Sequence, residues 1–291
     1  MDEEMMFEMS AGSLEGLPSV GEMFDLTGKV AVVSGTIGLA LSVIYRLASC
    51  GAKVVFGARR EVIGQMAEER LREMGLDVRF HKLDVSSVES CREIVAFAEQ
   101  TYGTVDIVVP VAAAFFARAF VDIKESEYDR IVDVDQKGQY FMIRGKKGGK
   151  VVTVASVAYR GEDMPKLAMM TAYNTAKAGV VGMTRGIAKE LKQYGINVNC
   201  VAPGGMVTPG AIFNNTTTAE LYGPEWTRYV TEYGAGVPVA PNPDEIARMI
   251  LTLCTPVSDF MYGQTVEVDG GSQFSFQDKP WSYTMEGGLH A

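Results

Sequence analysis

Short apolar segments alternate with longer segments of helical spacing along most of this 291-residue chain. The apolar segments have the length and composition of buried strands. They are Lys29–Ser34, Ala52–Phe56, Val78–Leu83, Val105–Val109, Lys150–Ala155, Ile196–Val201 and Thr265–Val268. The segments with helical spacing are Leu39–Ser49, Glu61–Met74, Val88–Tyr102, Glu125–Ile143, Thr171–Tyr194 and Asp244–Cys254. Because apolar strands joined by helices form parallel sheets that are covered on both faces, the sequence predicts a single α/β domain with a doubly wound sheet.

The alternation assigns residues 26–272 to this domain. Residues 1–25 are rich in Met, Glu and Gly and show no clear period. We interpret them as an N-terminal arm that is disordered or packed on a partner subunit. Residues 273–291 form a C-terminal tail, which contains Trp281 and Tyr283.

Composition excludes several functional classes. The net charge of −9 and the pI near 4.9 argue against nucleic acid as a partner, because binding phosphates requires a basic patch. No apolar run is long enough to span a membrane. The 4 cysteines are scattered and there are only 2 histidines, so neither a metal site nor a Ser-His-Asp triad is expected. Reduced thiols in a cytoplasmic protein are the interpretation that fits this cysteine pattern.

Tyr173 and Lys177 are spaced as an acid–base pair. In a helix, residues i and i+4 lie on the same face. A neighbouring ammonium favours the phenolate form, so we expect Lys177 to lower the pKa of Tyr173 toward working pH. Such a tyrosine can give a proton to a carbonyl oxygen or take one from an alcohol. An ordinary pair of residues on a helix surface is the alternative.

Several further segments share an order and spacing that resemble the short-chain dehydrogenase/reductase family, across roughly 245 residues. They are Leu83-Asp-Val85, Tyr173-Asn-Thr-Ala-Lys177, Asn199-Cys-Val-Ala-Pro-Gly-Gly-Met-Val-Thr208 and Gly263-Gln-Thr-Val-Glu-Val-Asp-Gly-Gly271. The resemblance implies a Rossmann-type fold, hydride transfer with a nicotinamide cofactor, and a homodimer or homotetramer.

The resemblance implies catalytic roles for four residues. Tyr173 is the expected general acid/base, and Lys177 is expected to lower its pKa and to bind the nicotinamide ribose. Ser156 is expected to steady the substrate oxygen, although a strand-end hydroxyl can instead cap backbone. Asp135 replaces the Asn of the family's proton relay and brings a carboxylate that perturbs the local electrostatics. A relay through its backbone carbonyl could survive that change.

The resemblance also implies a cofactor site at the carboxyl ends of the strands. Its expected residues are Gly35, Ile37, Gly38, Arg59, Arg60, Asp84, Val85, Pro203, Gly204 and Thr208, together with Tyr173 and Lys177. Ala58 stands where family members that prefer NAD carry Asp, and two arginines follow, which can bind a 2′-phosphate. We therefore favour NADP(H), with NAD(H) as the alternative. For the arginines the alternative is solvated surface charge, and for Asp84 it is a helix N-cap.

Three departures from the family pattern bear on activity. The phosphate loop around Gly35–Gly38 is about three residues short and should offer fewer backbone N–H groups. Pro110-Val-Ala-Ala113 and Asp135 replace the usual residues, and the helix that ends near Ile143 stops about eight residues early. Either these are real deletions, or the sequence joins segments across residues that are missing from it.

Residues 209–236 correspond to the family's substrate lid and carry several aromatic residues, which favour a hydrophobic alcohol or ketone. A lid helix packed on its own domain or on a neighbouring subunit is the alternative. The leading functional hypothesis is an NADP(H)-dependent oxidoreductase. The competing hypotheses are a catalytically impaired binding or scaffold protein, and an epimerase or dehydratase that uses the same pocket.

Overall fold

Seven parallel strands form the central sheet of the computed structural model, which describes residues 2–143, 149–161, 169–226, 228 and 239–272. The strands are β1 (Val30–Ser34), β2 (Lys53–Ala58), β3 (Val78–Lys82), β4 (Ile107–Pro110), β5 (Gly149–Val154), β6 (Ile196–Pro203) and β9 (Thr265–Val268). Their order is β3-β2-β1-β4-β5-β6-β9, so β2 and β3 are added on one side of β1 and the later strands on the other side, as in a Rossmann-type sheet. The predicted doubly wound α/β fold is therefore confirmed.

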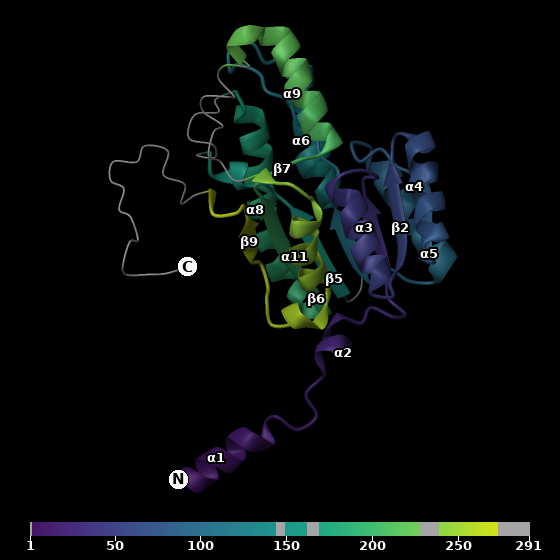
Figure 1. The fold of residues 1–291 in the computed structure, drawn as a ribbon, viewed down its shortest axis with the longest axis vertical. Helices are drawn as coiled ribbons and strands as arrows, with labels where there is room; N and C mark the ends of the chain where they lie inside the picture. Colours follow the sequence, from purple (N-terminus) through teal and green to yellow (C-terminus); the bar gives the residue numbers. More distant parts are fainter. Residues whose placement is uncertain (1, 144–148, 162–168, 227, 229–238, 273–291) are drawn as a thin grey trace, which may run out of the picture.

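Helices cover both faces of the sheet (Figure 1). One core cluster joins the strands to α3 (Leu39–Ser49), α4 (Glu61–Glu73) and α11 (Asp244–Cys254). A second cluster joins the opposite face to α5 (Val88–Tyr102), α7 (Gly138–Met142) and α8 (Thr171–Leu191). β1 illustrates why this arrangement is stable, because all five of its residues are buried between the two layers.

The helix predicted over Glu125–Ile143 is confirmed from Glu125 to Met142, but it is not α-helical throughout. It consists of α6 (Glu125–Val132), a π-helical turn η1 (Asp133–Lys137) and α7. Two contacts lie at the end of this π-turn. The side-chain amide of Gln139 donates a hydrogen bond to the Asp135 carbonyl at 2.9 Å, and Gly138 passes so close to the Val85 carbonyl that a Cβ there would lie 2.6 Å away. Such π-turns are frequent at functional sites.

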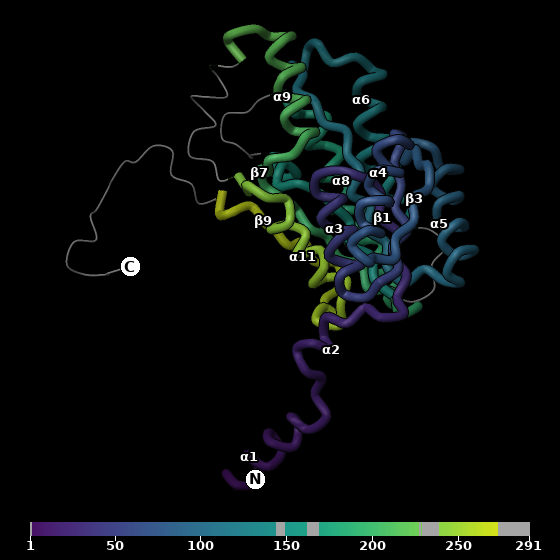
Figure 2. The backbone as a smooth tube through the Cα atoms, turned by 45° about the vertical axis from the view of Figure 1, so that its right-hand side comes forward, coloured from purple at the N-terminus to yellow at the C-terminus, as the bar shows by residue number. Residues whose placement is uncertain are grey.

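Other elements lie at both ends of the strands. Four lie beyond the carboxyl ends of β5 and β6, namely η2 (Val157–Arg160), the two-residue strands β7 (Gly205–Met206) and β8 (Val239–Ala240), and helix α9 (Pro209–Tyr222). The other two, η3 (Lys192–Tyr194) and η4 (Pro256–Ser258), precede β6 and β9. α9 lies beside α6 at one end of the molecule in two views (Figures 1 and 2). The Tyr222 hydroxyl accepts a hydrogen bond from the Ala119 N–H at 3.1 Å, which ties α9 to the segment after β4.

The N-terminal arm contains two helices, α1 (Glu3–Gly12) and α2 (Val20–Phe24). Asp2 caps α1, and Ser19 with Glu22 forms a capping box on α2. α1 projects away from the sheet (Figure 1), and its Phe7 is 67% exposed. The tail at 273–291 lies outside the described residues.

Candidate active site

The parallel strands bring Tyr173, Lys177 and Ser156 together at the carboxyl end of the sheet. Ser156 follows the carboxyl end of β5, while Tyr173 and Lys177 lie on the first two turns of α8, which packs on β6 and η2. The Nζ of Lys177 is 5.4 Å from the centroid of the Tyr173 ring. Residues separated by 21 positions in the sequence thus meet where such sheets bind ligands.

Tyr173 is enclosed by its neighbours. The ring of Phe115 meets it edge-on, with the centroids 5.0 Å apart, and the Ser156 hydroxyl lies within hydrogen-bonding range of the phenol. Burial raises the pKa of Tyr173, Lys177 opposes that effect, and the Asp135 carboxylate adds to it. Lys177 therefore lowers the pKa of Tyr173 as predicted, but burial and the Asp135 carboxylate outweigh it, so the net pKa is higher than usual.

Lys177 forms a buried ion pair with Asp135. The Nζ lies 2.9 Å from Oδ1 of Asp135, and the two side chains are 1% and 0% exposed. The Nζ also donates a hydrogen bond to the Val154 carbonyl at 3.1 Å. Burial alone would lower the pKa of Lys177, but the Asp135 carboxylate raises it above its usual value. The carboxylate thus holds Lys177 as an ammonium, and Lys177 in turn opposes the burial that raises the pKa of Asp135.

Gln139 is a supporting residue that the sequence reasoning missed. Its side-chain amide donates to the carbonyls of Val154, at 2.8 Å, and of Asp135, at 2.9 Å. Its carbonyl accepts from the Val154 N–H at 3.0 Å. These bonds fix the end of β5, and hence Ser156, to the turn that carries Asp135. The only sequence signal was a polar residue on the apolar side of a helix.

The position of Ser156 is compatible with both roles considered for it, which are capping backbone and contacting the substrate oxygen. Its hydroxyl accepts a hydrogen bond from the Ala158 N–H at 3.2 Å, so it caps η2. The same hydroxyl lies 3.5 Å from the Pro203 carbonyl and beside Tyr173. Gly204 is required after Pro203, because a Cβ there would lie 2.7 Å from the Cα of Asp269. The Pro-Gly turn therefore packs directly beside the acid–base cluster.

Only Gly35 to Gly38 connect β1 to α3, so the phosphate loop is as short as its sequence indicates. Gly35 and Gly38 have φ angles of +106° and +58°, which glycine tolerates best. Within the described chain, no side chain caps the N-terminus of α3, so its first N–H groups can receive an anion. Ile37 is partly exposed, and Thr208, the N-cap of α9, lies against Gly38. These groups fit a pyrophosphate.

Arg59 and Arg60 are exposed after the end of β2, and Arg59 lies near Asp84, which follows β3. Asp84 accepts hydrogen bonds from the N–H and the hydroxyl of Ser86. Burial raises its pKa, but these bonds and the charge of Arg59 hold the pKa below its usual value. Asp84 is not a helix N-cap, because Ser87 caps α5. The carbonyl of the adjacent Val85 lies against Gly138. The arginines thus place positive charge at the carboxyl end of β2.

Two of the lid aromatics that the structure describes pack on the protein itself. Trp226 is 7% exposed and donates from Nε1 to the Asn215 side chain at 2.9 Å, and Tyr222 bonds to Ala119. Phe213 is instead 66% exposed. Tyr229 and Tyr233 lie outside the described residues. For Trp226 and Tyr222, the packed-lid alternative therefore describes the structure better than stacking on a substrate.

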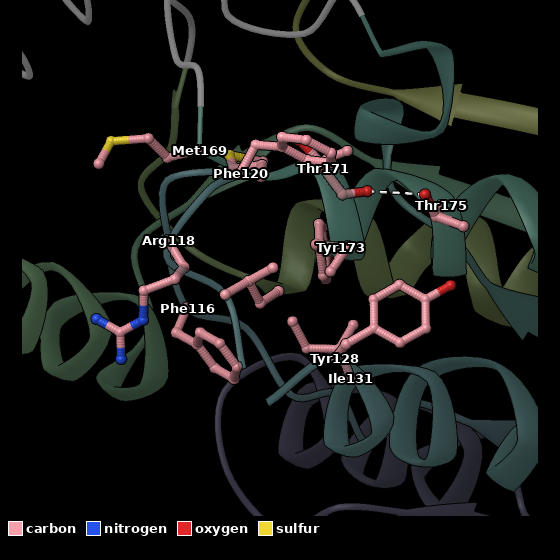
Figure 3. A pocket seen from close by; sticks show the side chains of 12 residues that line it. Phe116, Arg118, Phe120, Tyr128, Ile131, Met169, Thr171, Tyr173 and Thr175 are labelled. Carbon is pink, nitrogen blue, oxygen red and sulfur yellow. Dashed lines mark hydrogen bonds between the residues drawn. The ribbon is translucent and has the colours of Figure 1, made fainter. Parts of the chain in front are cut away.

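An apolar cavity of about 60 Å³ adjoins the cluster, and Tyr173 lines it (Figure 3). Its walls come from the segment after β4, from α6 and from the start of α8. Phe116, Tyr128 and Ile131 supply much of its apolar surface, and Met169 and Met170 complete it. Arg118 also reaches this region, but Glu127 neutralises it at 2.6 Å. The cavity therefore suits apolar groups.

No group of three His, Cys, Asp or Glu side chains in the described ranges could hold a metal ion. Across the same ranges, no helix is both long and apolar enough to cross a membrane. The groups that can do chemistry at this site are thus the phenol, the ammonium, the hydroxyl and the carboxylate of Tyr173, Lys177, Ser156 and Asp135.

Comparison with known proteins supports the resemblance seen in the motifs. A family model described as enoyl-(acyl carrier protein) reductase matches residues 33–273. Galactitol 2-dehydrogenase of Agrobacterium fabrum is 30% identical and the match covers 86% of this chain and 99% of the relative. Sorbitol dehydrogenase of Cereibacter sphaeroides is 32% identical, with the same coverage.

A solved structure gives the same result at the level of the fold. A variant of the actinorhodin polyketide ketoreductase, crystallised with NADPH, superposes with a TM-score of 0.75 at 28% identity. The match covers 84% of this chain and 97% of that protein. With the fold, the motif order and these relatives in agreement, the chain belongs to the short-chain dehydrogenase/reductase family of oxidoreductases, which act on alcohol and carbonyl groups with a nicotinamide cofactor.

Proposed function

We propose that this enzyme transfers a hydride between NADP(H) and a hydrophobic alcohol or ketone, with Tyr173 as the general acid/base. The observation that carries the proposal is the cluster of the half-buried Tyr173 and Ser156 with the buried Lys177 at the carboxyl end of the sheet, beside an apolar cavity that Tyr173 lines. The bound cofactor supplies the hydride, and the protein supplies position and a proton.

The side chains divide the remaining work. In reduction, the Tyr173 hydroxyl gives its proton to the carbonyl oxygen, and in oxidation the phenolate takes the alcohol proton. The Ser156 hydroxyl donates a hydrogen bond to the same substrate oxygen, where negative charge develops. The Lys177 ammonium stabilises the phenolate and would bind the nicotinamide ribose. Asp135 holds that ammonium in place through its 2.9 Å ion pair.

For the cofactor, the uncapped N-terminus of α3 and the loop glycines Gly35 and Gly38 would bind the pyrophosphate. Thr208, which lies against Gly38, would contribute its hydroxyl. The further residues proposed to line the cofactor site are Ile37, Asp84, Val85, Pro203 and Gly204. Arg59 and Arg60 would bind the 2′-phosphate. The ketoreductase relative that was crystallised with NADPH supports the preference for NADP(H).

Arg59→Ala is expected to weaken NADPH binding by roughly 10- to 100-fold, because a hydrogen bond to a charged group contributes about 1.5–3 kcal/mol. NADH binding should change little, since NADH lacks the 2′-phosphate. Nicotinamide fluorescence titration measures both constants. The matched control is Arg92→Ala, which removes a surface arginine that pairs with Glu89 on α5. Equal losses for NADPH and NADH would remove Arg59 from the 2′-phosphate site.

One experiment tests the whole proposal. NADPH binding is titrated by fluorescence, and the enzyme is then mixed with a panel of hydrophobic ketones and the matching alcohols. Tight binding with oxidation of NADPH by a ketone supports an oxidoreductase of this specificity. Binding without any turnover favours the scaffold hypothesis. Conversion of a substrate without net consumption of NADPH favours an epimerase or a dehydratase.

We also propose that residues 26–272 form the catalytic domain, with the lid at 209–236, and that the arm and the tail contact a second subunit of a homodimer or homotetramer. The support is the exposed apolar surface of the arm. Met5, Phe7 and Met9 on α1 are each more than half exposed and contact no core residue. A second chain would cover such a surface.

A further inference from the structure

The carboxylate of Asp135 connects three elements of the active site. Its Oδ1 lies 2.9 Å from Lys177 on α8, and its Oδ2 accepts a hydrogen bond at 2.7 Å from the Ala114 N–H in the segment after β4. The side chain itself projects from η1 and is fully buried. Both oxygens thus bind fixed groups in a site without bulk water, where charge interactions are strong.

The ion pair changes the charge that Tyr173 experiences. A lone Lys177 ammonium would present a full positive charge 5.4 Å from the centre of the phenol ring. The Asp135 carboxylate adds a negative charge 2.9 Å from that ammonium, so the ion pair is neutral overall. The phenol therefore loses much of the stabilisation that Lys177 alone would give to its anionic form.

We propose that Asp135 is a positioning residue that neutralises Lys177 and thereby keeps Tyr173 protonated at neutral pH, which favours reduction of a carbonyl over oxidation of an alcohol. In reduction the enzyme needs a phenol that can donate a proton. In oxidation it needs the phenolate, which forms only at higher pH. The inference rests on the proposed acid/base role of Tyr173 for its effect on turnover.

The charged and titratable groups around the pair are known from each neighbouring element. Lys177 faces Asp135 from η1, Tyr173 from its own helix and the buried thiol of Cys200 from β6. Tyr173 faces Lys177, Asp135 and the Ser156 hydroxyl. Burial and the Asp135 carboxylate both raise the pKa of Tyr173, whereas Lys177 and Ser156 lower it. Asp135 is thus the charged neighbour that opposes phenolate formation.

The test is Asp135→Asn, which keeps the size of the side chain and an acceptor for the Ala114 N–H but removes the charge. Because the cluster then carries one more positive charge, the Tyr173–Lys177 pair loses its first proton more easily. We expect its ionisation to move to lower pH by about 1–3 units, the usual effect of one close charge. The matched control is Asp133→Asn, which removes the same charge from the same turn, where it pairs with Lys137 at the surface.

Two readouts separate this inference from the proposed function. The first is the pH profile of kcat/KM for NADP⁺-dependent alcohol oxidation, whose rising limb should shift to lower pH in Asp135→Asn only. The second needs no turnover. It is the ultraviolet absorbance of phenolate during a pH titration, taken as the difference between each protein and the same protein carrying Tyr173→Phe. Asp135→Ser provides a second neutral variant, and circular dichroism confirms that each variant folds.

An acid shift in either readout that is absent from Asp133→Asn supports the inference. If the phenolate titration shifts but no alcohol or ketone is turned over, the inference stands and the proposed function fails. Unchanged ionisation in both readouts for the folded neutral variants overturns the inference. A shift to higher pH, or an equal shift in Asp133→Asn, overturns it as well.

Discussion

Tyr173→Phe should lower kcat by roughly 10²- to 10⁴-fold, the usual contribution of a positioned general acid/base. The substitution removes only the hydroxyl that exchanges a proton with the substrate. The ring remains, so its edge-on contact with Phe115 and its place in the core are preserved. NADPH binding and the thermal unfolding midpoint should therefore change little. The measurement is the initial rate of ketone reduction at saturating NADPH.

The matched control for this variant is Tyr140→Phe. Tyr140 lies on α7 and is 47% exposed, so removing its hydroxyl should leave turnover unchanged. Retention of nearly full activity by Tyr173→Phe would remove the tyrosine from the chemical step, even if the family assignment holds. A parallel loss of NADPH binding would instead indicate a structural defect, which the fluorescence titration separates from catalysis.

Lys177→Met is expected to reduce the free energy of unfolding by about 3–5 kcal/mol, because removing one partner leaves a buried charge without compensation. The stranded group is Asp135, which is fully buried and would retain only the Ala114 N–H on its carboxylate. The double variant Lys177→Met/Asp135→Asn should regain much of this loss. Urea unfolding at neutral pH of the wild type, both single variants and the double variant completes the cycle that gives the coupling energy.

The surface pair of Lys137 and Asp133 provides the control for stability. Its side chains are 42% and 39% exposed and lie 2.9 Å apart, so Lys137→Met should cost at most about 1 kcal/mol. If Lys177→Met costs no more than this surface variant, the buried pair is not the strong constraint that its geometry indicates. If the double variant is less stable than Lys177→Met, Asp135 stabilises the fold through contacts other than Lys177.

The sheet could be predicted well because its signal is local. Each strand is a short apolar run, and each covering helix has an apolar face, so residue types alone favour these elements. α5 and α11 have the bounds that the sequence predicts, and the motif order places the site at the strand ends. The i,i+4 spacing of Tyr173 and Lys177 likewise required only helix geometry.

The segment around Asp135 could not be predicted in the same way. Residues 125–143 have helical spacing throughout, but contacts with Val85 and Val154, which are distant in sequence, turn the middle into a π-helix. The same long-range packing decides that the Gln139 amide binds the end of β5. Residue spacing contains no information on these contacts, because they depend on how separate elements meet.

Local periodicity and motif order were sufficient to predict the α/β fold, the end of the sheet that holds the site, and the position of Tyr173 and Lys177 on one face of a helix. The charges around that pair follow instead from long-range packing. The pKa of a phenol inside a protein depends on its desolvation and on every charge nearby. Asp135 becomes such a charge only because the π-turn directs its carboxylate onto Lys177.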